Sequence, residues 1–279
     1  MKRYIYIVLL ILLIANFSYR IDLKKSPHKL IGELMYFPSG VAVKALSMGF
    51  YAPLADLVWL RFIQYYGEHR MTDVRFELMY HILDILTTLD TRFVHAYNLG
   101  ALMLAHDAQS PDQAFQLLKK AMYLNPEDWR YPFVYGFINY VFLAKYKVAE
   151  VYFRLAGQKP NATDMPKRWA AYCAYRKVGD LKTALALWLD LYNSTNNPEE
   201  KKIAEVYIKE IKMKLDIQFL NKKVKKFTEK FKHPPYGLRE LVLNAIIDSI
   251  PTEPHGGKYY LSKGRVKSSW ELRLKRRFR

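Results

Sequence analysis

The stretch AFQLLKKA at residues 114–121 decides the fold, because its internal spacing recurs along the chain. Its two alanines and the second leucine stand at positions i, i+4 and i+7, which fall on one face of an α-helix. The same triplet returns every 35 residues, as Met79, Leu83, Leu86; Ala114, Leu118, Ala121; Ala149, Phe153, Ala156; and Ala184, Trp188, Leu191. A fixed period of about 34 residues with two helices per unit is typical of a helical solenoid. The sequence therefore predicts an all-α fold of stacked helix pairs.

In each unit, the helix that does not contain the triplet carries a small residue directly after an aliphatic or aromatic residue. Residues 96–100 read AYNLG and residues 133–136 read FVYG, while WAAYC at residues 169–173 puts a cysteine in the small position. A glycine has no Cβ, so two helices can cross closely there. These segments are predicted to pair with the helices that contain the repeated triplet.

Helix ends are marked by proline, glycine and short polar residues. Asn125-Pro126 ends the second triplet helix, and the next helix is expected to begin near Trp129. Gly179-Asp180 is expected to form the turn between two helices of the last unit. Pro198, followed by two glutamates, begins a further helix well.

These residues resemble the tetratricopeptide repeat (TPR), whose pattern is a bulky residue, Leu-Gly, Ala, a large aromatic, Ala and Pro. The match covers residues 91–192, and it is looser over 51–90, where Met79 replaces the packing alanine and Thr91 stands at the proline position. The resemblance implies a TPR-like α-α superhelix of about four units over residues 51–192. An irregular helical bundle is the alternative.

The first 20 residues contain an uninterrupted apolar run. Residues 4–19 hold 16 residues without a charge, and Lys2, Arg3 and Arg20 flank them. As a helix the run would span roughly 24 Å, against about 30 Å of hydrocarbon in a bilayer. We predict a signal anchor or transmembrane helix over 1–20, giving a single-pass protein of the bacterial inner membrane with its C-terminal region outside the cytoplasm. A cleaved signal peptide is the alternative.

Residues 21–50 are predicted to be a linker, and an amphipathic helix follows over about 46–67. The block ADLVWLRFIQYYG at 55–67 is similar to the N-terminal part of a group of bacterial membrane-anchored TPR proteins. LDTRF at 89–93 resembles that group's LDPRF junction, with Thr91 in place of proline. The resemblance implies a location and an architecture, and no defined activity.

Positive charge gathers towards the C-terminus. Residues 201–279 carry 21 Lys/Arg against 8 Asp/Glu, which is +13 of the chain's +18. Residues 193–232 are predicted to be capping helices, with one break, over the last repeat. A basic surface is expected at Lys222, Lys223, Lys225, Lys226 and Lys230. This basic surface is either a solvated face or a binding surface for anionic lipid or nucleic acid. In the second case residues 273–279 would contribute to the binding.

Residues 233–279 change character and form a predicted tail with a basic end. A short helix is expected over 237–247, then IPTEPHGGKYYL at 250–261, a Lys263-Gly264 turn and a second strand over 265–269. The tail resembles that of the major pseudopilins of type II secretion, with Glu253 for the usual aspartate and His255 for the usual aromatic residue. The resemblance brings with it a possible calcium site, but the acidic cluster is absent here and we expect no metal.

No constellation of residues indicates catalysis or a cofactor. The seven histidines show no metal-binding spacing, no glycine-rich phosphate loop follows a strand, and Cys173 stands at a packing position. We therefore expect a protein-binding scaffold of the cell envelope, not an enzyme and without cofactors. Its pathway would be secretion or type IV pilus-type assembly, by resemblance only. An enzyme with an unrecognised site is a further alternative.

The scaffold is expected to hold an extended or helical segment of a partner protein in a groove lined by the first helix of each unit. The candidate groove residues are Tyr97, Leu104, Arg130, Phe133, Phe137, Tyr140, Lys167 and Lys177. The membrane is a second expected partner, through residues 1–20. Nucleic acid is the less favoured partner.

Overall fold

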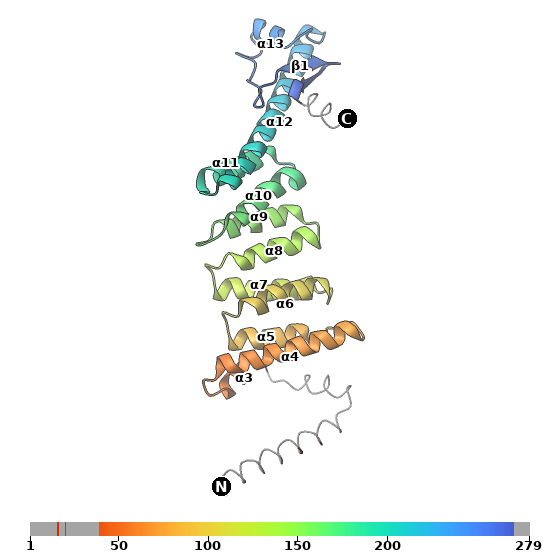
Figure 1. Cartoon of the computed structure of the whole chain (residues 1–279). Helices are drawn as coiled ribbons and strands as arrows, with labels where there is room; N and C mark the ends of the chain where they lie inside the picture. Colours follow the sequence, from red (N-terminus) through yellow and green to blue (C-terminus); the bar gives the residue numbers. More distant parts are fainter. Residues whose placement is uncertain (1–15, 17–19, 21–38, 271–279) are drawn as a thin grey trace. The chain divides into compact units, whose positions relative to one another are not determined.

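The computed structural model describes residues 39–270, together with Asn16 and Arg20. In this part the chain is mostly helical and ends in a two-stranded antiparallel sheet (Figure 1). The helices are α3 (Gly40–Leu46), α4 (Tyr51–Met71), α5 (Met79–Leu89), α6 (Val94–His106), α7 (Pro111–Leu124), α8 (Arg130–Val141), α9 (Tyr146–Gly157), α10 (Asp164–Cys173), η1 (Ala174–Val178), α11 (Leu181–Ser194), α12 (Pro198–Phe231) and α13 (Arg239–Leu243). The strands are β1 (Tyr259–Ser262) and β2 (Arg265–Ser268).

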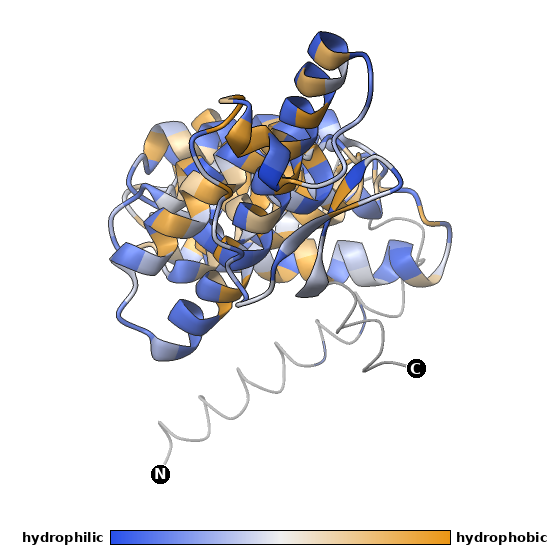
Figure 2. Ribbon diagram, turned by 90° about the horizontal axis from the view of Figure 1, so that it is seen from above, coloured by the Kyte–Doolittle hydropathy of each residue, from blue (hydrophilic) through white to orange (hydrophobic). Residues whose placement is uncertain are grey.

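The chain divides into two compact units, residues 1–125 and residues 126–279. The boundary falls at Asn125-Pro126, where the predicted helix end is confirmed because α7 stops at Leu124. The helix expected near Trp129 begins at Arg130. Apolar and polar residues alternate along the ribbons of the helices (Figure 2), as expected of helices that bury one face.

In the first unit the repeated positions form the core. All six of them, Met79, Leu83, Leu86, Ala114, Leu118 and Ala121, are fully buried. Gly100 of α6 lies directly against α5, since a Cβ at this position would be 2.7 Å from two carbons of Leu83. The predicted close crossing of helices at a glycine is therefore confirmed.

One lysine ties α7 to the C-terminal end of α5. The Lys120 ammonium donates hydrogen bonds to the Asp84 carboxylate (2.7 Å) and carbonyl oxygen (3.0 Å). It also donates to the hydroxyls of Thr87 (3.0 Å) and Thr88 (2.8 Å). A cation at this place compensates the partial negative charge at a helix C-terminus.

In the second unit α8, α9, α10 and α11 pack in chain order (Figure 1). The repeated residues of α9 and α11, Ala149, Phe153, Ala156, Ala184, Trp188 and Leu191, are again fully buried. A Cβ on Gly136 of α8 would be 2.9 Å from the Phe153 ring. Each unit thus contains paired helices with the predicted packing positions inside, an arrangement consistent with an α-solenoid.

The turn expected at Gly179-Asp180 is present. The five-residue π-helix η1 ends at Val178, and Gly179 follows it with a φ of 79°, in the left-handed region that glycine adopts without strain. The Asp180 carboxylate then accepts hydrogen bonds from the Thr183 N–H (3.0 Å) and hydroxyl (2.7 Å), which caps the start of α11.

Helix α12 runs from Pro198 to Phe231, so the break expected within it does not occur. Its N-terminal half packs on α11 through Ala204, Ile208 and Ile211. Its C-terminal half joins a separate core that contains Leu220, Phe227, Leu241 and Val266. One helix therefore belongs to two hydrophobic cores.

The predicted C-terminal hairpin is confirmed. Strands β1 and β2 pair with Ser262 opposite Arg265, and the two turn residues Lys263 and Gly264 both have positive φ, 52° and 75°. Positive φ at both central residues is the geometry of the two-residue turns that suit the right-handed twist of a hairpin.

The predicted membrane location is overturned. Within residues 39–270 no helix is long and apolar enough to cross a membrane. The two longest helices show why: α4 carries charges along its 21 residues, and α12 is rich in lysine. The segment 1–20, on which the prediction rested, lies outside the described residues except for Asn16 and Arg20.

Glu150 of α9 should make stability depend on pH. It is 8% exposed, and burial is the main cause that raises its pKa above the ordinary value of 4.5. The unfolded chain therefore loses this proton at lower pH than the folded chain does. The free energy of unfolding should fall as pH rises through the interval between the two pKa values.

Glu150→Gln should remove this slope and raise the urea midpoint at pH 7, as measured by circular dichroism from pH 4 to 8. The matched control is Glu127→Gln, at an exposed carboxylate of the same unit. Equal pH profiles for Glu150→Gln and the unaltered chain would contradict the assignment.

Candidate functional site

Aromatic residues of α8 gather around Trp169 of α10. The ring centroids of Phe133, Phe137 and Tyr140 lie 6.3, 6.1 and 5.3 Å from that of Trp169. Phe153 of α9, at 5.5 Å, lies against the same indole. The three α8 residues and Trp169 are only partly buried, so this cluster presents aromatic surface as well as packing.

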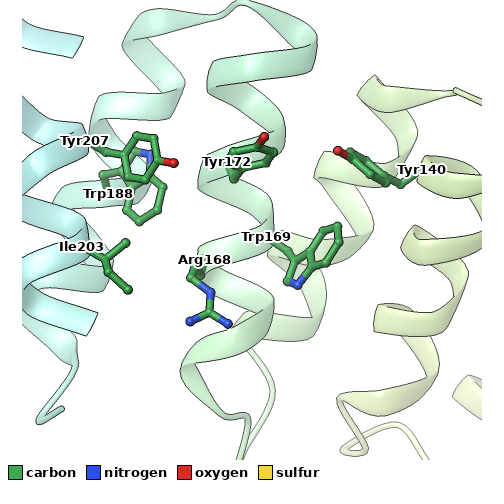
Figure 3. A pocket seen from close by; sticks show the side chains of 7 residues that line it. All are labelled: Tyr140, Arg168, Trp169, Tyr172, Trp188, Ile203 and Tyr207. Atoms are coloured by element: carbon green, nitrogen blue, oxygen red, sulfur yellow. The ribbon is translucent and has the colours of Figure 1, made fainter. Parts of the chain in front are cut away.

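A hollow of about 430 Å³ opens beside this cluster. Its lining comes from α8, α10, α11 and α12: Tyr140, Arg168, Trp169, Tyr172, Trp188, Ile203 and Tyr207. Figure 3 shows Tyr140 and Trp169 on one side, Trp188, Ile203 and Tyr207 on the other, and Arg168 and Tyr172 between them. We call this site the aromatic hollow.

A stacked pair of rings forms one wall of the aromatic hollow. Trp188 and Tyr207 stack with ring centroids 4.4 Å apart and planes 8° from parallel. Tyr172 meets Tyr207 edge-on at 6.3 Å. The Trp188 indole N–H is buried and has no hydrogen-bond acceptor among the described residues. Because Trp188 is fully buried and Tyr207 only partly, Tyr207 supplies the accessible ring of this wall.

An ion pair lies at the base of the hollow. Arg168 donates through Nη1 to Glu200 Oε1, and the Glu200 side chain is 12% exposed against 38% for Arg168. The second carboxylate oxygen, Oε2, is buried without a donor among the described residues. The pair neutralises Glu200, and the Arg168 side chain stays partly exposed where it lines the hollow.

Lys177 lies over two tyrosines next to the hollow. Its ammonium is 5.8 Å from the ring centroid of Tyr140 and 5.0 Å from that of Tyr146. Such distances allow cation–π attraction. No described carboxylate forms an ion pair with Lys177, so its positive charge is not balanced by a partner.

The prediction for two groove residues is wrong. Tyr97 and Leu104 are fully buried in the first unit, and the Tyr97 hydroxyl donates to the Thr87 carbonyl at 3.3 Å. The reason is helical geometry: they stand three residues before and four after Gly100, on the α6 face that packs against Leu83. They form core and offer no surface to a partner.

Two other predicted groove residues, Arg130 and Lys167, do not line the aromatic hollow. Arg130 pairs with Asp128 at 2.6 Å, and it begins α8 while Tyr140 stands ten residues further on. Lys167 pairs with Asp190 (3.1 Å) and donates to Ser194 (2.9 Å). Lys167 lines a second hollow of about 380 Å³ with Arg154, Gly157, Gln158, Ala170, Leu187 and Asp190. The structure therefore brings together Phe133, Phe137, Tyr140 and Lys177 of the predicted set.

The predicted basic surface on α12 is partly engaged with the protein itself. Lys223 donates to the Ile246 carbonyl at 3.1 Å, and Lys225 approaches Glu229 at 3.9 Å. Lys230 lies 5.2 Å from the Phe231 ring centroid. Lys222 and Lys226 are exposed. The surface is basic but is not shaped into a site.

Sequence reasoning missed most of the lining of the aromatic hollow. The repeat predicts that Trp188 packs inside, which is correct, and its ring supports Tyr207 at the wall of the hollow. Arg168, Trp169 and Tyr172 follow one another at helical spacing on α10, and this pattern was the available signal. Ile203 and Tyr207 come from α12, outside the repeats, and the repeat pattern contains no information on them.

The described residues offer little for catalysis. No group of three or more His, Cys, Asp or Glu side chains in residues 39–270 could hold a metal ion. Cys173 is buried, donates to the Tyr146 carbonyl (3.3 Å), and burial raises the pKa of its thiol to about 11. A thiol of that pKa is protonated and a poor nucleophile at neutral pH. The aromatic hollow is lined by rings, by Ile203 and by the guanidinium of Arg168.

Comparison with known proteins identifies no family and no relative of this chain. No protein-family model matches the sequence, and no similar sequence is found among curated proteins. The fold and the aromatic hollow therefore carry the functional argument alone.

Proposed function

We propose that the chain is a helical-repeat scaffold that binds a segment of a partner protein at the aromatic hollow. The observation that carries this is the hollow itself: five aromatic side chains, two of them tryptophans, around an open space of about 430 Å³. Tryptophan, tyrosine and arginine are the residues that contribute most to protein–protein binding energy.

The paired helices support the finer part of the proposal, a TPR-like superhelix. Glycines at equivalent places in α6 and α8 let each helix approach its partner, and the triplet positions are buried in both units. A repeat fold of this kind presents a continuous surface along its first helices. The partly exposed rings of α8 and α10 belong to that surface.

Binding of anionic lipid or nucleic acid through α12 is the weaker candidate. Three of the five lysines of the predicted basic surface are engaged by Ile246, Glu229 and Phe231. Such binding would weaken steeply with salt, because it releases counterions from the anion. Binding at the aromatic hollow depends chiefly on apolar contact and should change little between 50 and 300 mM salt.

Site-specific crosslinking tests the proposal. A photo-crosslinking amino acid at position 137 or 140, beside the hollow, should capture partner proteins in living cells, and mass spectrometry identifies them. The comparison site is Lys222, which is exposed on α12.

Protein captured at 137 and 140 and not at 222 is the expected result. Lipid or nucleic acid captured at 222, with nothing at 137 or 140, would overturn the scaffold and favour the basic surface.

A further inference from the structure

We infer that the aromatic hollow takes one aromatic or branched aliphatic side chain of the partner segment, together with a carboxylate next to that side chain. This inference rests on the proposed function and specifies the chemistry of the partner. It is carried by the shape of the hollow and by the charges that face it.

The shape argues for a single large apolar side chain. At about 430 Å³ the hollow lies at the small end of the range, about 300–1,000 Å³, of pockets that hold small ligands. Its opposite walls are aromatic, with Tyr140 and Trp169 on one side and, on the other, Tyr207 stacked on the fully buried Trp188 (Figure 3). An aromatic or branched side chain between such walls buries apolar area on both faces.

The charges argue for an adjacent carboxylate. The Arg168 guanidinium lines the hollow, and its side chain is 38% exposed, whereas Glu200, the carboxylate that pairs with it, is 12% exposed. Asp164, the acid on α10, accepts a hydrogen bond from the Thr195 hydroxyl at 2.5 Å. Arginine has five N–H donors in a planar fork and can bind a second carboxylate beside the first.

The same charges argue against a cationic guest. Rings around a cavity attract quaternary ammonium groups, and the five aromatic side chains would suit one. Here, however, the Arg168 guanidinium lines the hollow between the two walls. A positively charged guest would meet it, so the hollow should reject lysine and its methylated forms.

Three capped hexapeptides test the inference on the full chain by fluorescence polarisation. The first, Ser-Gly-Phe-Asp-Gly-Ser, carries both features; the second has alanine for phenylalanine, and the third has lysine for aspartate. N-acetyl and C-amide ends remove terminal charges. The first peptide should bind about tenfold more tightly than the second and about fivefold more tightly than the third.

Variants assign each preference to its residues. Trp169→Ala should abolish the preference for phenylalanine over alanine and keep the preference for aspartate over lysine. Trp169→Phe should restore most of the preference for phenylalanine. Arg168→Gln with Glu200→Gln, which keeps a neutral hydrogen-bonded pair, should abolish the preference for aspartate alone. Lys222→Gln is the matched control, because this lysine lies on α12 outside the hollow, and it should change neither ratio.

Each other outcome overturns the inference in a recognisable way. If the three peptides bind equally and position 137 still crosslinks to a partner, the proposed function stands and the inferred chemistry of the partner is wrong. Tighter binding of the lysine peptide than of the aspartate peptide would contradict the expected preference for a carboxylate. No peptide binding and no crosslinks removes both proposals.

Two outcomes would show that the aromatic hollow has a different occupant. Self-association in sedimentation velocity that Trp169→Ala abolishes would make the occupant a second copy of the chain. A crosslink from position 172 to a residue of the same molecule outside α8, α10, α11 and α12, the helices that line the hollow, would make it a segment of this chain. Either result overturns a separate partner.

Discussion

Replacing Trp188 by alanine should lower the free energy of unfolding of the second unit by about 3–5 kcal/mol, the usual cost of removing a buried large ring. The side chain is the largest of those that are fully buried. Its ring also stacks on Tyr207 at 4.4 Å, which joins α11 to α12. The variant therefore loses both its burial and the contact that holds one wall of the aromatic hollow.

Urea denaturation followed by circular dichroism measures the loss, with Trp188→Phe as the matched variant. Phenylalanine keeps a ring against Tyr207 and should recover at least half of the lost stability. It also removes the indole N–H, which has no acceptor among the described residues, at no cost in hydrogen bonding. A loss below about 1 kcal/mol for Trp188→Ala would show that α11 and α12 do not depend on this contact.

Glu253→Ala should unfold the C-terminal core at much lower urea than the unaltered chain requires. The carboxylate is 3% exposed and accepts three hydrogen bonds. The donors are the N–H groups of His255 (2.9 Å) and Gly257 (2.6 Å) and the hydroxyl of Ser268 (3.0 Å). Without it the buried Ser268 hydroxyl and the two part-buried N–H groups lack this acceptor, and since an orphaned buried donor costs about 1–3 kcal/mol, a total loss of about 3 kcal/mol is expected.

Hydrogen exchange of the β1 and β2 amides reports this loss locally. Glu253→Gln keeps the shape but replaces one acceptor oxygen by an amide NH₂, and its effect should be intermediate. Thr252→Ala, at the exposed neighbouring residue, is the control and should leave exchange unchanged. Unchanged strand protection in Glu253→Ala would mean that the loop is held by other contacts.

The repeats could be predicted from the sequence because they are local. A triplet spaced four and three residues apart specifies one helix face wherever it occurs, and a glycine such as Gly136 marks where the next helix crosses. The hairpin could be predicted for the same reason, since Lys263-Gly264 lies directly between its two strands. Short-range patterns thus gave the elements and most of the core.

The aromatic hollow could not be predicted in the same way. Its walls come from four helices, and Tyr207 reaches Trp188 only because α12 folds back on α11. Extending the groove to Tyr97 by repeat register failed because position in the repeat does not determine exposure. In α6 that position faces Leu83, whereas in α8 the equivalent Phe133 meets Trp169 and stays partly open.

The length of α12 has a consequence for the order in which the protein is made. Residues 140–188 leave the ribosome first and include five of the seven lining residues of the hollow. Ile203 and Tyr207 follow on a helix of 34 residues, about 51 Å long, whose far half packs on strands ending at Ser268. A nascent chain that ends before Pro198 lacks both of these residues, so the hollow is complete only after α12 has been translated.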